Sequence, residues 1–254
     1  MRLFLLSTCT LLACAALPAA SAAEDDHITP YRPTVSNSAQ LPTPGQLELE
    51  LGLLAAHNEA HRSSLPYLFK LAFNPQWGVL VGGEALVSQR NDDGSTQRGI
   101  GNTAITAKRA FLIDDATAFG LEFGVNLPTA RDSIGGGRTD FTLNGIVSRD
   151  LGPVHVDTNL NFTRVGAIEP DTGRLQTGLS AAFSTPLGTQ WNLSAELSGT
   201  RRTDAPTTAQ VLAALAFSPN KKMTIDFGVS KGLRADARDW SFFTGVVVPI
   251  AQLW

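Results

Sequence analysis

Residues 45–56, GQLELELGLLAA, alternate apolar side chains with polar residues or glycine. The leucines from Leu47 to Leu53 occupy odd positions, whereas Glu48 and Glu50 occupy even positions. Because successive side chains of a strand point to opposite faces, this pattern predicts a β-strand with one apolar and one polar face. A soluble β-sandwich would bury the leucines, whereas a membrane barrel would turn them to lipid and direct the glutamates into its lumen.

The rest of the chain favours the membrane barrel. Further alternating segments of about ten residues follow, which is the length a tilted strand needs to cross a bilayer. Short links rich in Asp, Asn, Pro and Gly alternate with longer ones, and aromatic residues gather near both ends of the apolar faces. We therefore predict an all-β fold, a twelve-stranded antiparallel up-and-down transmembrane β-barrel. The predicted strands are residues 46–56, 65–73, 77–88, 102–112, 118–127, 140–149, 154–164, 175–184, 190–199, 208–218, 223–230 and 240–250.

The N-terminus indicates export. An apolar run at residues 3–16 is too short to span a bilayer, and Ser-Ala-Ala at residues 21–23 offers a cleavage site. We expect residues 1–23 to be a signal peptide; the alternative is a lipoprotein signal with a lipidated Cys14. Residues 24–44 are polar and contain four prolines, which predicts an irregular periplasmic lead-in before a barrel of residues 45–254.

The polar faces of the predicted strands carry the candidate lumen chemistry. One interpretation is a narrow, acid-biased pore that favours cationic or polar solutes. The other is a set of ion pairs that fill the barrel. Lys108 and Glu122 lie on adjacent predicted strands around a tight turn, and Lys70 and Glu50 are similarly placed across the first hairpin. The candidate lumen or solute-binding residues are Glu48, Glu50, Lys70, Glu84, Lys108, Glu122, His155, Asp157, Glu196 and Asp226.

Enzymatic and metal-dependent functions have little support. The chain has no Gly-x-Ser-x-Gly and no His-Glu-x-x-His motif, and no activated serine is evident near His155. His57 and His61 are expected in a long loop, where we favour solvated side chains over metal ligands. Both cysteines lie in the signal segment, which excludes cysteine-ligated metal from the mature chain. We assign no catalytic residue, no metal and no cofactor, and the predicted protein is not an enzyme.

Three stretches resemble the family named after a MetA pathway of phenol degradation. These are RPTVSNSAQLPTPGQLELELG at residues 32–52, RGIGNTAITAKRAF at 98–111 and FGVNLPTARDSIGGG at 123–137. Asn102 stands where that family usually has Asp. The resemblance covers most of residues 29–254 and implies an outer-membrane protein with a transport role.

The expected function is therefore passive diffusion of small solutes, aromatic or cationic, through an outer-membrane channel of a Gram-negative bacterium. The alternatives are a plugged structural or adhesion-type barrel and, less favoured, a barrel lipid hydrolase. Expected partners are outer-membrane lipid and lipopolysaccharide, which the external Arg201–Arg202 pair would contact, and the assembly machinery, which would read the terminal strand ending at Trp254. A formal net charge of −3 gives no reason to expect a nucleic-acid partner.

Overall fold

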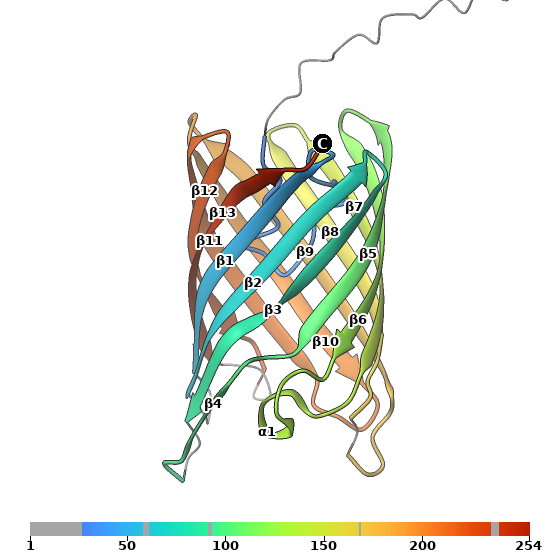
Figure 1. The fold of residues 1–254 in the computed structure, drawn as a ribbon, viewed down its shortest axis with the longest axis vertical. Coiled ribbons are helices and arrows are strands. Elements are labelled where there is room, and N and C mark those ends of the chain that lie inside the picture. Colours follow the sequence, from blue (N-terminus) through green and yellow to red (C-terminus); the bar gives the residue numbers. More distant parts are fainter. Residues whose placement is uncertain (1–26, 58–60, 91–92, 168, 235–238) are drawn as a thin grey trace, which may run out of the picture.

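In the computed structural model of the protein, twelve antiparallel strands form a closed barrel (Figure 1). The structure describes residues 27–57, 61–90, 93–167, 169–234 and 239–254. The first strand, β1, pairs with the last, β13, and this pairing closes the sheet. One further strand, β4, is four residues long and pairs only with β3, so it extends a long link and is not part of the wall.

Each of the twelve wall strands pairs with its two neighbours in the barrel. The first and last residues of these strands agree closely with the segments predicted from the sequence. A short helix, α1 (Asp132–Gly135), lies in the link between β6 and β7. The strands are β1 (Gln46–His57), β2 (His61–Asn74), β3 (Trp77–Arg90), β4 (Thr96–Gly99), β5 (Thr103–Asp114), β6 (Thr117–Leu127), β7 (Asp140–Leu151), β8 (Val154–Arg164), β9 (Leu175–Leu187), β10 (Trp191–Arg202), β11 (Thr208–Asn220), β12 (Met223–Gly232) and β13 (Trp240–Gln252).

The two faces of β1 are those of a membrane barrel. Leu51 and Leu53 are 39% and 57% exposed on the outer surface, whereas Glu48 and Glu50 are buried inside. The exposed outer face carries aromatic side chains at both ends of the wall, as interfacial girdles require. Near the short turns these are Phe73, Trp77, Phe111, Phe119, Phe183 and Trp191, and near the long links Phe141, Phe162, Trp240 and Phe242.

Two local expectations are wrong. The alternation of the third predicted strand assigns Val87 to the lipid side, but Val87 is buried and Leu86 is exposed. The register between β2 and β3 shifts between Ser64 and Pro66, and the extra residue of this bulge inverts the alternation beyond it. His57 and His61 are not loop residues either, since β1 ends at His57 and β2 begins at His61.

The N-terminal segment lies within the barrel. Residues 27–44 are irregular, and Figure 1 shows this blue segment threading the interior before it joins β1. Its first described residues lie at the end of the wall that carries the short turns, where the amide of Ile28 donates to the carbonyl of Lys221. We call residues 27–44 the plug. Among the described residues no helix is long and apolar enough to cross a membrane.

Candidate functional site

Carboxylates of the wall bind the backbone of the plug. Glu48 accepts hydrogen bonds from the amide of Thr29 at 3.1 and 3.2 Å, and Glu50 accepts from the amides of Tyr31 at 2.8 Å and Arg32 at 3.2 Å. An irregular segment cannot pair its own N–H groups, and leaving them unpaired in a buried place is costly. The alternating glutamates of β1 therefore replace the pairing that a strand would give this segment.

The opposite side of the wall binds the plug in the same way. Glu196 on β10 accepts from the amides of Val35 and Ser36, each at 2.8 Å. The side-chain amide of Asn37 donates to Glu122 on β6 at 3.0 Å, and its backbone amide donates to Asn159 at 3.0 Å. The plug is thus bound by strands on both sides of the lumen.

Two fully buried lysines complete these contacts. Lys70 lies 2.9 Å from Glu48 and 2.6 Å from Glu50, and its ammonium also donates to the carbonyl of Thr29. Lys108 lies 3.0 Å from Glu122 and donates to the carbonyl of Ser38. Both ion pairs expected from the sequence are present, and both lysines also bind the plug. A buried ion pair needs such additional hydrogen bonds to offset the loss of water.

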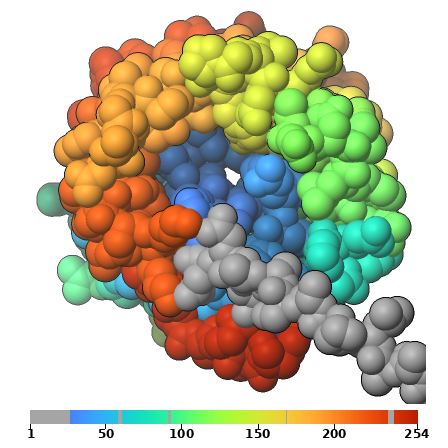
Figure 2. Space-filling view, turned by 90° about the horizontal axis from the view of Figure 1, so that it is seen from above, coloured from blue at the N-terminus to red at the C-terminus, as the bar shows by residue number. Residues whose placement is uncertain are grey.

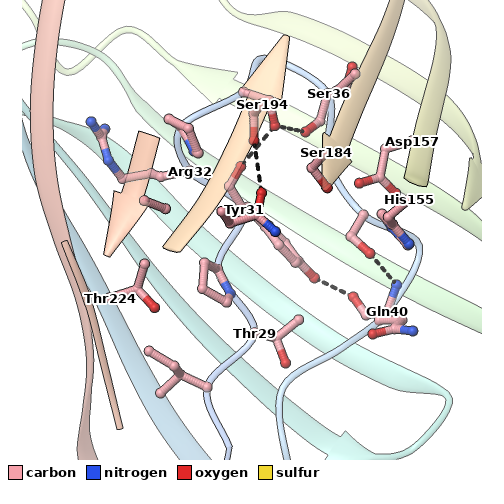
Figure 3. Close-up of a pocket in the computed structure, with 18 of the residues that line it drawn as sticks. Thr29, Tyr31, Arg32, Ser36, Gln40, His155, Asp157, Ser184, Ser194 and Thr224 are labelled. Carbon is pink, nitrogen blue, oxygen red and sulfur yellow. Dashed lines mark hydrogen bonds and ion pairs between the residues drawn. The ribbon is translucent and has the colours of Figure 1, made fainter. Parts of the chain in front are cut away.

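Tyr31 lies between these two lysines. The ammonium nitrogens of Lys70 and Lys108 are 4.5 and 4.2 Å from the centre of its ring, within the range of cation–π attraction. Burial, together with the carboxylates led by Glu122, raises the pKa of Tyr31 well above its usual value. The phenol therefore stays protonated and donates to the carbonyl of Gln40 at 2.6 Å, which ties one part of the plug to another (Figure 3).

Arg32 joins the plug to β12. Its Nε and Nη2 donate to the two carboxylate oxygens of Asp226 at 2.9 and 3.0 Å. The guanidinium lies against two glycines that pair with each other across the β1–β13 junction, Gly52 and Gly245. A Cβ atom at Gly52 would lie 2.6 Å from Arg32 Nη1, so a larger residue there would displace the arginine.

His155 lies near the short-turn end of the lumen. Its Nδ1 is 2.5 Å from Asp150 and its Nε2 is 3.2 Å from Asp157. Ser148 donates to Asp157 and accepts from the amide of Ala39 at 2.7 Å. This cluster therefore reaches the plug through the serine hydroxyl.

The structure brings most of the predicted lumen residues together around the plug. Glu84 is separate, since it pairs with Arg62 at 2.5 Å, and His155 and Asp157 lie beside the plug. Of the predicted lumen residues, those that bind the plug directly are Glu48, Glu50, Lys70, Lys108, Glu122, Glu196 and Asp226.

Sequence reasoning missed the plug's own side chains, above all Tyr31 and Arg32. The four prolines of the segment indicate an irregular backbone, but they do not indicate that the segment lies inside the barrel. Among the described residues no group of three or more His, Cys, Asp or Glu side chains is arranged to hold a metal ion.

Space remains beside the plug. A cavity of about 460 Å³ lies between the plug and strands β8–β12, and Figure 3 shows the hydroxyl groups of Thr29, Ser184, Ser194 and Thr224 around it. A second cavity of about 210 Å³ is lined by Glu122 and other residues of β5, β6 and β7. In Figure 2, viewed along the barrel, a small opening passes through the molecule next to the blue plug.

A closed barrel with an apolar outer band and a polar interior is the fold of outer-membrane porins and channels. A family model described as "Putative MetA-pathway of phenol degradation" matches residues 31–249. The chain belongs to this family. No functionally curated protein matches the chain in sequence.

Solved structures share the fold. A COG4313 outer membrane channel from Pseudomonas putida F1 superposes with a TM-score of 0.66 at 12% identity, covering 89% of this chain and 98% of the other. The NanC porin gives 0.57 at 9% identity, covering 80% of this chain and 100% of the other. The KdgM porin in complex with disordered oligogalacturonate gives 0.55 at 11% identity, covering 80% and 99%. These similarities establish the architecture.

Proposed function

We propose that the protein is a passive channel for small solutes in the outer membrane, narrowed by its own N-terminal plug. The observation that supports this proposal most directly is the opening that remains beside the plug in a closed barrel (Figure 2). The cavity of about 460 Å³ next to the plug has the size of a site for a small molecule.

We propose that fewer lumen carboxylates are available to solutes than the sequence composition suggests. Glu48, Glu50 and Glu196 are bound to amide groups of the plug, and Asp226 is paired with Arg32. The carboxylate that lines the large cavity is that of Asp157. Because Arg32 and His155 line the same cavity, we infer that the preference for cations over anions is weak.

The cavity lining supports small polar solutes. Its walls are rich in hydroxyl and amide groups from β9 to β12, which can replace the hydrogen bonds that a polar solute makes with water. A hydrophobic aromatic compound would leave these groups unpaired, at a cost for each buried group. We therefore propose polar or cationic solutes, with aromatic compounds as the second candidate class.

Solute uptake by liposomes that contain the purified, folded protein tests the proposal. The panel comprises small neutral polyols, small organic cations and simple aromatic compounds, each compared with protein-free liposomes. We expect uptake of the first two classes and low, stepwise conductance in planar bilayers. Folded protein that supports neither uptake nor conductance steps would favour the alternative of a structural or adhesion-type barrel.

We also propose that the barrel has no hydrolytic activity. Both ring nitrogens of His155 face carboxylates, and the hydroxyl of Ser148 donates to Asp157 rather than to the imidazole. A serine nucleophile needs an imidazole that accepts its proton. Lipid hydrolysis that disappears in His155→Ala would contradict this assignment.

Export, lipid contacts and assembly of the barrel in the outer membrane are also part of the proposal. The predicted signal peptide, residues 1–23, lies outside the described residues. We propose that Arg201 and Arg202, at the long-link end of β10, contact lipopolysaccharide phosphates. Replacing both with glutamine should reduce the lipopolysaccharide that copurifies with the protein, and unchanged retention would exclude them as a contact. Assembly through the terminal strand is tested by deleting Trp254 and measuring insertion.

A further inference from the structure

Two histidines lie side by side on the outer surface of the barrel, away from the lumen. His57 and His61 are directly paired residues of β1 and β2, and both are exposed. Their Nδ1 atoms are 3.1 Å apart, and their ring centres are 4.3 Å apart. When both rings are neutral, one Nδ1 can donate a hydrogen bond to the other. The pairing of the two strands thus holds the two Nδ1 atoms close together.

This separation suits two ligands of one metal ion. Imidazole nitrogens bind Zn²⁺ at about 2.0–2.1 Å, and two such bonds with the observed nitrogen separation enclose an angle of about 98° at the metal. That angle lies between the values for square-planar and tetrahedral coordination. With a hydrogen atom on each Nε2, both Nδ1 lone pairs can point at the ion, and binding replaces the hydrogen bond between the rings.

The surroundings form a pocket on one side of the pair. His57, His61, Trp240 and Phe242 line a depression of about 420 Å³ on the barrel surface. The rings of Trp240 and Phe242 are nearly parallel, with centres 6.4 Å apart. The aromatic side chains lie on one side of the imidazoles, and because both imidazoles are exposed, water can supply the remaining ligands.

Two described cations on the neighbouring strands, Arg62 and Lys231, do not oppose a bound metal ion strongly, because each has an anionic partner. Arg62 pairs with Glu84 at 2.5 Å on the lumen side of the wall. Lys231 lies 3.5 Å from Asp239, and its ammonium is 4.8 Å from the centre of the Trp240 ring.

We propose that His57 and His61 form a chelating site for a divalent transition-metal ion of the Cu²⁺, Ni²⁺ or Zn²⁺ class at the long-link rim of the barrel. Imidazole ligands suit these ions, and affinity for a given nitrogen site is highest for Cu²⁺. The site lies outside the lumen, so it is independent of the proposed channel function.

Calorimetric titration of the untagged, detergent-solubilised full chain with Cu²⁺ tests the proposal. We expect one ion per chain with micromolar affinity. His57→Gln and His61→Gln should each weaken binding at least tenfold, and the double variant should abolish it. His27→Ala, which removes a histidine at the opposite end of the barrel, is the matched control and should bind as the wild type does. Binding by the double variant equal to that of the wild type would overturn the proposal.

Tryptophan fluorescence gives a second measurement of metal binding that is independent of calorimetry. Cu²⁺ bound beside Trp240 should quench part of the emission, and Trp240→Phe should lose this quenching while it keeps the calorimetric binding. Circular dichroism of each variant confirms that the barrel is folded. Quenching that persists unchanged in the folded double variant would place the ion elsewhere and exclude this site.

Discussion

Arg32 of the plug and Asp226 of β12 form a two-pronged ion pair, with both carboxylate oxygens bound at 2.9 and 3.0 Å. The pair connects the N-terminal segment to a strand almost two hundred residues further along the chain, because the hydrogen-bonded residues are 194 positions apart. β13 lies between β12 and β1, and β1 holds the same part of the plug through Glu50. The plug therefore bridges the junction at which the barrel closes.

Replacing Arg32 with alanine should both destabilise the protein and widen the channel. Asp226 is fully buried, and removing one partner of a buried ion pair costs about 3–5 kcal/mol. We expect a lower midpoint of urea unfolding and a higher single-channel conductance. Lys231→Ala is the matched control, since its partner Asp239 is exposed and the pair does not bind the plug. An unchanged conductance in Arg32→Ala would show that this contact does not position the plug.

Gly52→Ala should have the same effect without removing a charge. The added Cβ would lie 2.6 Å from Arg32 Nη1, so the guanidinium must move away from its place beside the β1–β13 junction. We expect a conductance between those of the wild type and Arg32→Ala. Gly145→Ala is the control, because a Cβ there meets no atom closer than 3.9 Å. Equal conductance in Gly52→Ala and wild type would mean that Arg32 adjusts without moving the plug.

The ring of Tyr31 should matter more than its hydroxyl group. Tyr31→Phe loses one buried hydrogen bond, worth about 1 kcal/mol, and keeps the ring between the two lysines. Tyr31→Ala loses the ring as well, and truncating a buried aromatic side chain costs about 3–5 kcal/mol. Urea unfolding and bilayer conductance should therefore separate the two variants. If Tyr31→Phe were as destabilised and as conductive as Tyr31→Ala, the hydroxyl would be the main contact.

Ion selectivity should respond in opposite directions to the two members of the Arg62–Glu84 pair. Glu84→Gln leaves the guanidinium without its anion and should shift the reversal potential in a salt gradient towards anion preference. Arg62→Gln leaves the carboxylate and should shift the potential towards cations. Shifts of the same sign, or none, would exclude this pair from the permeation pathway.

Substitution of Glu196 should change the conductance of the channel, because the Glu196 carboxylate binds two backbone amides of the plug. Glu196→Gln keeps the size of the side chain and weakens these bonds, since amide donors prefer a charged acceptor. We expect a rise in conductance together with any change in selectivity. A change in selectivity alone, measured in the same bilayers, would instead identify Glu196 as part of the pore lining.

The fold was predictable to a large extent because its signal is local. In a membrane barrel each strand repeats the same alternation, so a short stretch such as residues 46–56 already distinguishes outer from inner positions. The same parity placed Lys70 beside Glu50 and Lys108 beside Glu122, because each pair lies on the inward faces of two strands that are consecutive in the chain. Val87 shows the limit of parity, since a bulge changes the alternation without a clear mark in the composition.

The strands of the barrel wall, the membrane-facing side of most of their positions and the inward direction of the lumen charges thus followed from the sequence alone. The tertiary structure decided what those charges bind. The contacts of Glu196 with Ser36 and of Asp226 with Arg32 join residues 160 and 194 positions apart, and no periodicity relates them. The pairing of His57 with His61 likewise depends on where the two strands end. Local alternation determines which face a side chain occupies, whereas its partner across the lumen depends on how the closed barrel brings distant segments together.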